Sequence, residues 1–376
     1  MINHNIEMAG PNITQKDEKI VLDALRNGWY GKNKFYYVEK FEKDFAKFHN
    51  RKYGLMTPNC TTALHLLLHS LGVSKGDNVA NQECTWVAAA AAVKYTGAKN
   101  NFIDIEKDTW CMCPKNLENK INKKTKAILV SDIYGNMPQM NKIIKISRKY
   151  KIPIIEDAAE ALGSLYKNKR AGSFGVASTF SFHRTKTLTT GEGGMIITND
   201  KKLFEKCKFY RDQGRNKSQS YLIDELGYKY MPFNIQAALG YSQFKRINHI
   251  VDLKRNIFFK FKKFLSNLDD LYFNMENENV YNGCWATTLV IGNSYKINAN
   301  SLIKSLNKMG LPTRPFFAPL SSMKPFLDTR AMHSNSNAYY IYKRGITLPS
   351  ALNLTDKQIK YYSNAIKKIL INAKKN

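Results

Sequence analysis

Short apolar runs alternate with amphipathic stretches from the beginning of the chain to about residue 200. An apolar run of about four to eight residues between polar turns predicts a buried strand, whereas apolar residues three and four positions apart predict one face of a helix. The stretch 38–48 follows the second rule, because Val38, Phe41, Phe45 and Phe48 share one face. The predicted strands are 53–56, 78–80, 101–105, 127–131, 152–156, 178–182 and 195–198, and the other predicted helices are 14–26, 61–71, 86–95 and 140–150. Strands that alternate with helices favour an α/β fold with a largely parallel sheet.

The chain beyond residue 200 has more widely spaced signals. A helical stretch begins near Asn234 and runs into a segment rich in lysine and phenylalanine. Strand 285–291, helix 301–309 and a terminal helix after Thr355 follow. Because 376 residues exceed the size at which one hydrophobic core stops growing, we expect two domains. We place their division at residue 250, so that residues 1–250 form the N-terminal segment and large domain, and residues 251–376 form the small C-terminal domain.

Lys186 has a sequence setting that is unusual for a lysine. It follows the apolar run 176–182 and precedes the glycine-rich turn 191–194. Most lysines are solvated surface charges, and this is the alternative here as well. An amine held in a half-buried turn loses its proton more easily, and a neutral amine can form a Schiff base with a carbonyl compound such as pyridoxal phosphate. Lys186 is therefore a candidate for a covalent cofactor site.

Asp157 could serve the same cofactor. It ends the predicted apolar strand, and ligands bind at the carboxyl ends of strands in open parallel sheets. An ionised carboxylate beside a pyridine nitrogen would keep that nitrogen protonated. The alternative is that Asp157 caps a helix at 158–161. Trp86, at the start of an alanine-rich helix, could stack on the cofactor ring or belong to the core.

Residues 57–64 join a predicted strand to a predicted helix. The free N–H groups and the dipole of a helix N-terminus attract anions, and the Thr61 hydroxyl adds a donor. A phosphate site and simple N-capping by Asn59 or Thr61 are both compatible with this pattern. The same helix carries His65 and His69 four positions apart, but residue 66 is a leucine, so the glutamate of a zinc-protease motif is missing and we expect no metal.

The net charge of +28 suggests a nucleic-acid partner at first sight. The lysines are scattered among asparagine and isoleucine, however, and form no basic arm or arginine-rich helix. We therefore expect no nucleic acid, although the charge could still attract an anionic substrate. The closest cysteines, Cys111 and Cys113, lack the two-residue spacer of redox or zinc motifs, which favours free thiols in a reducing compartment. No apolar stretch is long enough to span a membrane, and residues 1–5 lack a signal-peptide core, so a cytoplasmic location without membrane contact is expected.

The sequence contains four motif segments in a characteristic order and spacing, at 59–66, 156–161, 179–194 and 234–238. Together they resemble the nucleotide-sugar aminotransferases of the DegT/DnrJ/EryC1/StrS family, and the match runs over nearly the whole chain. Within that family, segments 187–194 and 344–350 are similar to those of GDP-perosamine synthases.

This resemblance implies fold type I of the pyridoxal-phosphate-dependent transferases (aspartate aminotransferase-like), with a large, mainly parallel seven-stranded sheet domain and a small C-terminal α/β domain. It also implies a homodimer in which both subunits line each active site. By position, Lys186 would bind pyridoxal 5′-phosphate covalently, Asp157 would pair with the pyridine nitrogen and Trp86 would stack on the ring. The other implied cofactor contacts are Cys60, Thr61 and Ser181 at the phosphate, Glu160 near the ring hydroxyl, and Asn234 in a segment, 228–234, that reaches in from the partner subunit.

The activity that the resemblance implies is transamination, of EC 2.6.1 type. Glutamate would give its amino group to the cofactor, which would pass it to a nucleotide-linked 4-keto-6-deoxyhexose and yield a 4-amino-4,6-dideoxyhexose for O-antigen or another surface glycan. Lys186 would move protons as general base and acid, and Arg314 would lie on the substrate side. His183 would assist at the sugar site, and the alternative is that it caps the preceding strand. A related dehydratase branch has histidine in place of the lysine, so Lys186 favours transamination.

Some positions depart from the family pattern. Met231 stands where relatives often have arginine or asparagine, so the phosphate contact from the partner would fall to Lys229 or Asn234. Ala318 and Ser321 stand where a sugar-site loop usually carries tyrosine and histidine. The substrate therefore stays open between GDP-, dTDP- and UDP-linked sugars and between 4-keto and 3-keto groups. A lysine-rich nucleic-acid-binding or regulatory protein on the same fold is the non-enzymatic alternative, and the Asp157–Lys186 pair argues against it.

Overall fold

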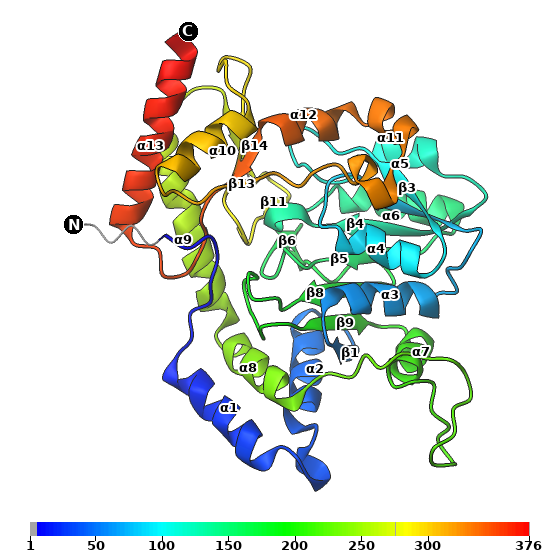
Figure 1. Ribbon diagram of the computed structural model, residues 1–376. Helices are drawn as coiled ribbons and strands as arrows, with labels where there is room; N and C mark the ends of the chain where they lie inside the picture. Colours follow the sequence, from blue (N-terminus) through cyan, green and yellow to red (C-terminus); the bar gives the residue numbers. More distant parts are fainter. Residues whose placement is uncertain (1–5, 275, 376) are drawn as a thin grey trace.

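The structure is a computed structural model that describes residues 6–274 and 276–375. Its largest sheet contains β1 Tyr53–Thr57, β2 Asn78–Gln82, β3 Lys99–Ile103, β4 Thr125–Ser131, β5 Ile154–Asp157, β8 Ala177–Ser181 and β9 Gly194–Thr198. The strand order is β1-β9-β8-β5-β4-β2-β3 (Figure 1). β9 is antiparallel to β1 and β8, and the other neighbouring strands are parallel. Each strand overlaps one of the seven predicted from apolar runs, and the α/β class with a large, mainly parallel sheet is confirmed.

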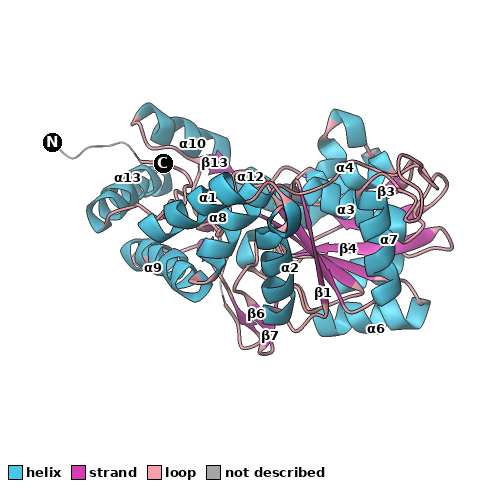
Figure 2. Ribbon diagram, turned by 90° about the horizontal axis from the view of Figure 1, so that it is seen from below, coloured by secondary structure: helices cyan, strands magenta, loops and turns pink. Residues whose placement is uncertain are grey.

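Helices cover both faces of this sheet (Figure 2). One face packs against α2 Tyr36–Phe48, α6 Met140–Tyr150 and α8 Asn234–Phe244, and the other against α3 Cys60–Ser70, α4 Ala88–Tyr95 and α7 Lys201–Arg211. Successive residues of a strand point to opposite faces, which is why Ile128 and Val130 of β4 join the first layer and Leu129 joins the second. The sheet is thus buried on both sides, and its free carboxyl edge is where a ligand can enter.

A smaller antiparallel sheet lies beside the large one, with the order β10-β12-β14-β13. Its strands are β10 Leu271–Phe273, β12 Thr288–Ile291, β13 Arg314–Pro315 and β14 Gly345–Thr347, and its helices are α9 Ile247–Leu265, α10 Ala299–Lys308 and α13 Asp356–Lys375. α9 joins the two parts: Val251 packs in the cluster of the large sheet, whereas Ile257 packs in that of the small one. Ile6 also packs in the smaller cluster. The division predicted at residue 250 falls inside α9 and stays a prediction.

The remaining elements lie around these two sheets, and apart from α1 they are short. They are α1 Gln15–Asn27, α5 Pro114–Lys120, α11 Thr329–Ser334, α12 Ser336–Arg344, the small sheet of β6 Leu165–Tyr166, β7 Lys169–Arg170 and β11 Val280–Tyr281, and the 3-10 turns η1 Gly31–Asn33, η2 Ile133–Gly135, η3 Leu320–Ser322 and η4 Lys324–Phe326.

Some predicted boundaries were wrong, and two of them concern the site. α4 begins at Ala88, so Trp86 precedes the helix that it was expected to open. β12 begins at Thr288, so Trp285 lies in the segment before the strand rather than in it. β3 lies two residues earlier than predicted, because its polar N-terminal residues pair with β2 at the sheet edge. α7 was missed because it buries only Leu203, Cys207 and Arg211, which is too few for a clear apolar stripe.

All six cysteines are free. Within the described residues, no helix is both long enough and apolar enough to cross a membrane. Residues 1–5, for which we predicted no signal-peptide core, lie outside the described part.

Candidate active site

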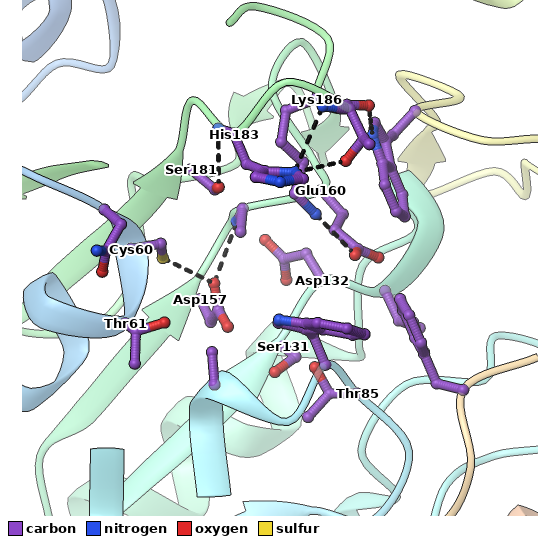
Figure 3. Close-up of a pocket in the computed structure, with 18 of the residues that line it drawn as sticks. Cys60, Thr61, Thr85, Ser131, Asp132, Asp157, Glu160, Ser181, His183 and Lys186 are labelled. Atoms are coloured by element: carbon purple, nitrogen blue, oxygen red, sulfur yellow. Dashed lines mark hydrogen bonds and ion pairs between the residues drawn. The ribbon is translucent and has the colours of Figure 1, made fainter. Parts of the chain in front are cut away.

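A cavity of about 780 Å³ lies at the carboxyl edge of the large sheet and is closed on one side by residues that follow α9 in the chain (Figure 3). It is lined by nine of the ten residues predicted for the site, namely Cys60, Thr61, Trp86, Asp157, Glu160, Ser181, His183, Lys186 and Arg314. These residues come from segments that are far apart in the sequence, and the parallel sheet brings them together at one edge.

Lys186 lies in the loop between β8 and β9. The loop is fixed by the buried side chains of Phe182 and Leu188 and by the Lys186 N–H, which donates to the His183 carbonyl at 2.8 Å. The Lys186 amine donates to Glu160 Oε1 at 2.9 Å and lies 3.9 Å from the centroid of the Trp285 ring. Its side chain is only 11% exposed. The amine is therefore held at the cavity wall between a carboxylate and an aromatic face.

Asp157 ends β5 on the floor of the same cavity. Its Oδ1 accepts the Ala159 N–H at 3.2 Å and has the Cys60 thiol 3.8 Å away. Burial raises the pKa of Asp157 to about 6, although the Ala159 N–H and the nearby Lys186 charge act in the opposite direction. A cationic group bound against Asp157 would offset this cost of burying its charge.

The N-terminus of α3 forms one end of the cavity. Asn59 caps the helix by accepting the Thr62 N–H at 2.9 Å, and the N–H groups of Cys60 and Thr61 are not needed for helical bonds. Gly194 allows this close approach: a Cβ there would lie 2.5 Å from the Asn59 carbonyl carbon and 2.7 Å from the Cys60 nitrogen. Free N–H groups at a helix start form an anion site. Since the Cys60 thiol contacts Asp157, an anion contact of Cys60 would come from its backbone.

Taken together, these groups fit pyridoxal 5′-phosphate. The anion site at Thr61 and the Ser181 hydroxyl suit a phosphate, Asp157 suits a protonated ring nitrogen, and the Lys186 amine suits an aldehyde. Trp86, 59% exposed at the cavity, offers a flat side chain for the ring. Among the described residues, no group of three or more His, Cys, Asp or Glu side chains could hold a metal ion.

Asn234 is the one predicted cofactor residue that, of those described, does not line this cavity. Its amide oxygen accepts the Tyr37 N–H at 3.0 Å, and its NH₂ group donates to the carbonyls of Gly28 and Asn33 at 3.4 and 3.3 Å. Within one chain it therefore ties the start of α8 to the loop after α1. Lys229, the other residue considered for the partner's phosphate, forms an ion pair of 2.9 Å with Asp212. The contact through a partner subunit stays a prediction.

The mouth of the cavity carries positive charge from Arg184 and Arg314. His183 lines the same cavity; its Nδ1 is 2.9 Å from Thr185 Oγ1, its Nε2 is 3.6 Å from a Glu192 carboxylate oxygen, and burial lowers its pKa. Two guanidinium groups at the entrance suit a phosphate-bearing substrate.

The loop around residue 318 contributes less than its position in the sequence suggested. Ser321 is buried, its N–H donates to Glu83 at 2.8 Å, and its hydroxyl is 2.8 Å from the Tyr339 hydroxyl. Of the described residues of this loop, Arg314 and Phe317 line the cavity, but Ala318 and Ser321 do not.

Sequence reasoning missed several lining residues, including Asp132, Arg184, Trp285 and Phe317. Asp132 directly follows β4, so the rule about carboxyl ends that identified Asp157 could have found it as well. Its two carboxyl oxygens receive no hydrogen bond from any described residue, and burial, with the nearby carboxyls of Glu156 and Asp157, raises its pKa well above the usual range. Trp285 and Phe317 had no local signal.

Comparison with known proteins points in the same direction. The sequence profile of the DegT/DnrJ/EryC1/StrS aminotransferase family matches residues 11–367. GDP-perosamine synthase of Escherichia coli O157:H7 is 36% identical over 356 residues, which cover 95% of this chain and 96% of that protein. GDP-perosamine synthase of Vibrio cholerae is 32% identical over 359 residues, with 95% and 97% covered. The PLP form of Spr1654 from Streptococcus pneumoniae superposes with a TM-score of 0.90 at 24% identity and covers 98% of this chain and 99% of that one, which supports the fold.

Proposed function

The chain belongs to the DegT/DnrJ/EryC1/StrS aminotransferase family, and from this premise we propose that it transfers the amino group of glutamate to a nucleotide-linked 4-keto-6-deoxyhexose. It is a pyridoxal-phosphate-dependent aminotransferase that acts on nucleotide sugars. The identity of the donor and the 4-keto position are the parts that we propose. The observation that carries the proposal is the placement of Lys186 and Asp157 in one cavity, beside the free N-terminus of α3.

Different residues of the cavity would hold different parts of the cofactor. Pyridoxal 5′-phosphate, when bound, supplies an electron sink that makes the Cα–H of an amino acid acidic. Asp157 would keep the ring nitrogen protonated, and the α3 N-terminus with Thr61 and Ser181 would bind the phosphate. Trp86 would cover the ring on the open side of the cavity, where it excludes water from the reacting carbon.

Lys186 is the group placed to move a proton. In the first half of the reaction it would take the proton from the donor's Cα as a general base and pass it to the cofactor as a general acid. In the second half it would run the transfer in reverse and give a proton to the sugar carbon. The Glu160 carboxylate, 2.9 Å from its amine, would keep the side chain at the cavity wall during both steps. A lysine at this position favours transamination over the dehydration carried out by the histidine-bearing branch.

The two arginines that line the cavity support a nucleotide sugar as the substrate. Arg184 and Arg314 can bind the diphosphate of a nucleotide sugar through paired N–H donors, and His183 would lie near the sugar. The GDP-perosamine synthases among the relatives support a GDP-linked substrate and a 4-amino-4,6-dideoxyhexose product that enters a surface glycan. A dTDP- or UDP-linked sugar, or a 3-keto group, is the alternative.

We also propose a homodimer that works in the cytoplasm. Exposed aromatic side chains gather beside α8, where Trp29 and Phe233 are 49% and 55% exposed and their ring centroids lie 6.5 Å apart. Such an apolar surface suits a second copy of the chain. The segment 228–234 would then approach the partner's cavity. Six unpaired cysteines suit a reducing compartment.

The first test concerns the cofactor. Purified protein with pyridoxal phosphate should absorb visible light, and borohydride should fix the cofactor to Lys186, as peptide mass analysis would show. Lys186→Ala and Lys186→Arg should both abolish the borohydride-fixed adduct, and Lys43→Ala, an exposed change on α2, should not. If Lys186→Ala leaves absorbance and trapping unchanged, the assignment is wrong.

The second test concerns the substrate. The enzyme and glutamate are incubated with a panel of GDP-, dTDP- and UDP-linked 4-keto-6-deoxyhexoses, and the products are identified by mass and NMR. We expect amination at C4 of the GDP-linked sugar. Amination of only a dTDP- or UDP-linked sugar, or at C3, would replace the proposed substrate and leave the aminotransferase assignment in place.

A further inference from the structure

Trp285 contacts the turn that carries Lys186 although the two residues lie far apart in the sequence. Its indole Nε1–H donates to the Thr185 carbonyl at 2.8 Å, directly before the lysine. The face of the same indole lies 3.9 Å from the Lys186 amine. Trp285 thus holds both the backbone and the side-chain end of the lysine.

The indole is itself fixed by an aromatic stack of Trp285, Tyr134 and Phe317. The rings of Trp285 and Tyr134 are nearly parallel, at 12° with centroids 5.9 Å apart, and those of Tyr134 and Phe317 at 8° and 4.9 Å. The Tyr134 N–H donates to Glu160 Oε2 at 2.9 Å, while Glu160 Oε1 accepts the Lys186 amine. Tyr134 therefore supports both partners of the amine, Trp285 on one side and Glu160 on the other.

The backbone at this junction adopts an uncommon conformation on both sides. Tyr134 has φ 52° and Cys284, directly before Trp285, has φ 53°. Left-handed conformations at residues other than glycine persist where the surroundings fix them, and they gather at functional sites. Here the Cys284 N–H donates to Asn282 Oδ1 at 2.6 Å, and a Cβ at Gly135 would lie 2.9 Å from the Cys284 nitrogen. The two segments meet so closely that the indole has little freedom.

We propose that Trp285 is a positioning residue that holds the Lys186 turn and aims its amine into the cavity. The inference rests on the proposed function, since it assigns Trp285 a role in the reactivity of the cofactor lysine. The indole N–H fixes the carbonyl before the lysine, and the ring face attracts the amine when it carries its proton. Because Trp285 and Phe317 both follow α9 in the chain, the C-terminal part of the molecule controls a lysine that belongs to the large sheet.

The proposal concerns how fast the Lys186 amine captures the aldehyde of pyridoxal phosphate. In this step the amine nitrogen bonds to the aldehyde carbon, and the aldehyde oxygen leaves as water. A misplaced amine slows the step, whereas the strength of cofactor binding without a covalent bond depends on Asp157 and the α3 N-terminus. Pyridoxamine 5′-phosphate separates the two quantities, because it carries an amine in place of the aldehyde and cannot react with the lysine.

The experiment uses the full-length protein freed of cofactor. Capture is followed after addition of pyridoxal phosphate by absorbance and by the fraction fixed with borohydride, and pyridoxamine phosphate affinity is measured in parallel. Trp285→Leu should slow capture about 10- to 100-fold, and Trp285→Phe, which keeps a ring but lacks the N–H, about 3- to 10-fold. Pyridoxamine phosphate affinity should change less than about twofold. Trp110→Phe is the control for altered packing behind the stack, because Trp110 is fully buried and packs edge-on against Tyr134 but does not line the cavity; it should leave the capture rate unchanged.

Each outcome of this experiment supports or overturns the role of Trp285. Unchanged capture in Trp285→Leu overturns the inference, and so does a loss of pyridoxamine phosphate affinity as large as the loss of capture rate, which would show a general role in pocket structure. If Trp285→Leu does not fold, Trp285→Phe gives the same comparison. Failure of the unaltered protein to capture pyridoxal phosphate through Lys186 would instead overturn the proposed function.

Discussion

Replacing Asp157 by asparagine should stabilise the cofactor-free protein at neutral pH. Burial raises the pKa of this carboxyl from 3.8 to about 6, so the folded protein holds the proton more tightly than the unfolded chain does. Ionised Asp157 therefore costs the folded state stability. The difference between 3.8 and about 6 corresponds to about 3 kcal/mol at pH 7.5. The side-chain oxygen of asparagine can still accept the Ala159 N–H, so the change removes the charge with little other loss.

The dependence on pH gives the sign of the effect. The cost is near its full size well above pH 6, shrinks as the pH falls through the folded pKa of about 6 toward 3.8, and disappears only well below 3.8, where Asp157 is protonated in both states. Urea unfolding of the cofactor-free proteins at pH 7.5, 5 and 4 measures it. The gain of Asp157→Asn should be about 3 kcal/mol at pH 7.5 and less than about 1 kcal/mol at pH 4. Asp252→Asn, an exposed change on α9, should have a small effect throughout.

In the presence of cofactor, the loss of the Asp157 charge should be unfavourable. Because Asp157 would pair with the protonated ring nitrogen, Asp157→Asn should weaken binding of pyridoxamine phosphate by about 10- to 100-fold, as measured by absorbance or fluorescence titration. A variant that is less stable than the unaltered protein at pH 7.5, or a gain at pH 4 as large as the gain at pH 7.5, would refute this account of the buried charge.

Further changes test the rest of the site. Gly194→Ala should destabilise the protein by about 1–3 kcal/mol in urea unfolding and weaken pyridoxamine phosphate binding, because the new Cβ would clash with the backbone of Asn59. Gly10→Ala is the control: its Cβ would lie 4.0 Å from the nearest side chain, so stability and binding should stay unchanged. Glu160→Gln should lower kcat about 10-fold with little change in the KM of the sugar, because it keeps the acceptor for Lys186 but removes the charge. Asp132→Asn should stabilise the protein at pH 7.5 but not at pH 4 in urea unfolding. The raised pKa of Asp132 means that ionising this carboxyl costs the folded state more than the unfolded chain, and the asparagine removes that cost. Equal stability of the two proteins at pH 7.5 would contradict this.

The large sheet was predictable because each of its strands contains buried apolar residues in a short run between turns, although β2, β3 and β8 also carry polar residues and Lys99 of β3 is exposed. Such runs need no distant information, and so all seven strands were found. The helices that pack with a broad apolar face, such as α2 and α6, were found for the same reason. α7 and the short elements near α11 bury few side chains, and their formation depends on contacts with distant parts of the chain that no local pattern records.

The site was predictable where its residues follow a strand or begin a helix. Lys186, Asp157 and the start of α3 each have that kind of local context, and the sheet topology then brings them together. Trp285 has no such context. Before an apolar run it resembles the first residue of a strand, and its contact with the lysine depends on the left-handed Cys284 and on a stack with Tyr134. Asn234 forms hydrogen bonds within its own chain, and its contact with the cofactor of a partner subunit stays a prediction that a single chain does not test.

The distribution of charge within the cavity favours two ligands bound at separate places rather than a general attraction of anions. Asp132, Asp157 and Glu160 line it at buried positions, whereas Arg184 and Arg314 line it at exposed positions, with one exposed carboxylate, Glu192, beside His183. Since the whole chain carries +28, a surface that only attracted polyanions would need no buried carboxylates. A ligand that is cationic at one ring atom and anionic at its phosphate uses the floor and the α3 N-terminus together, and its cation offsets the cost of ionised Asp157. The arginines then remain free for a second anionic ligand, which is the arrangement that a cofactor and a nucleotide sugar require.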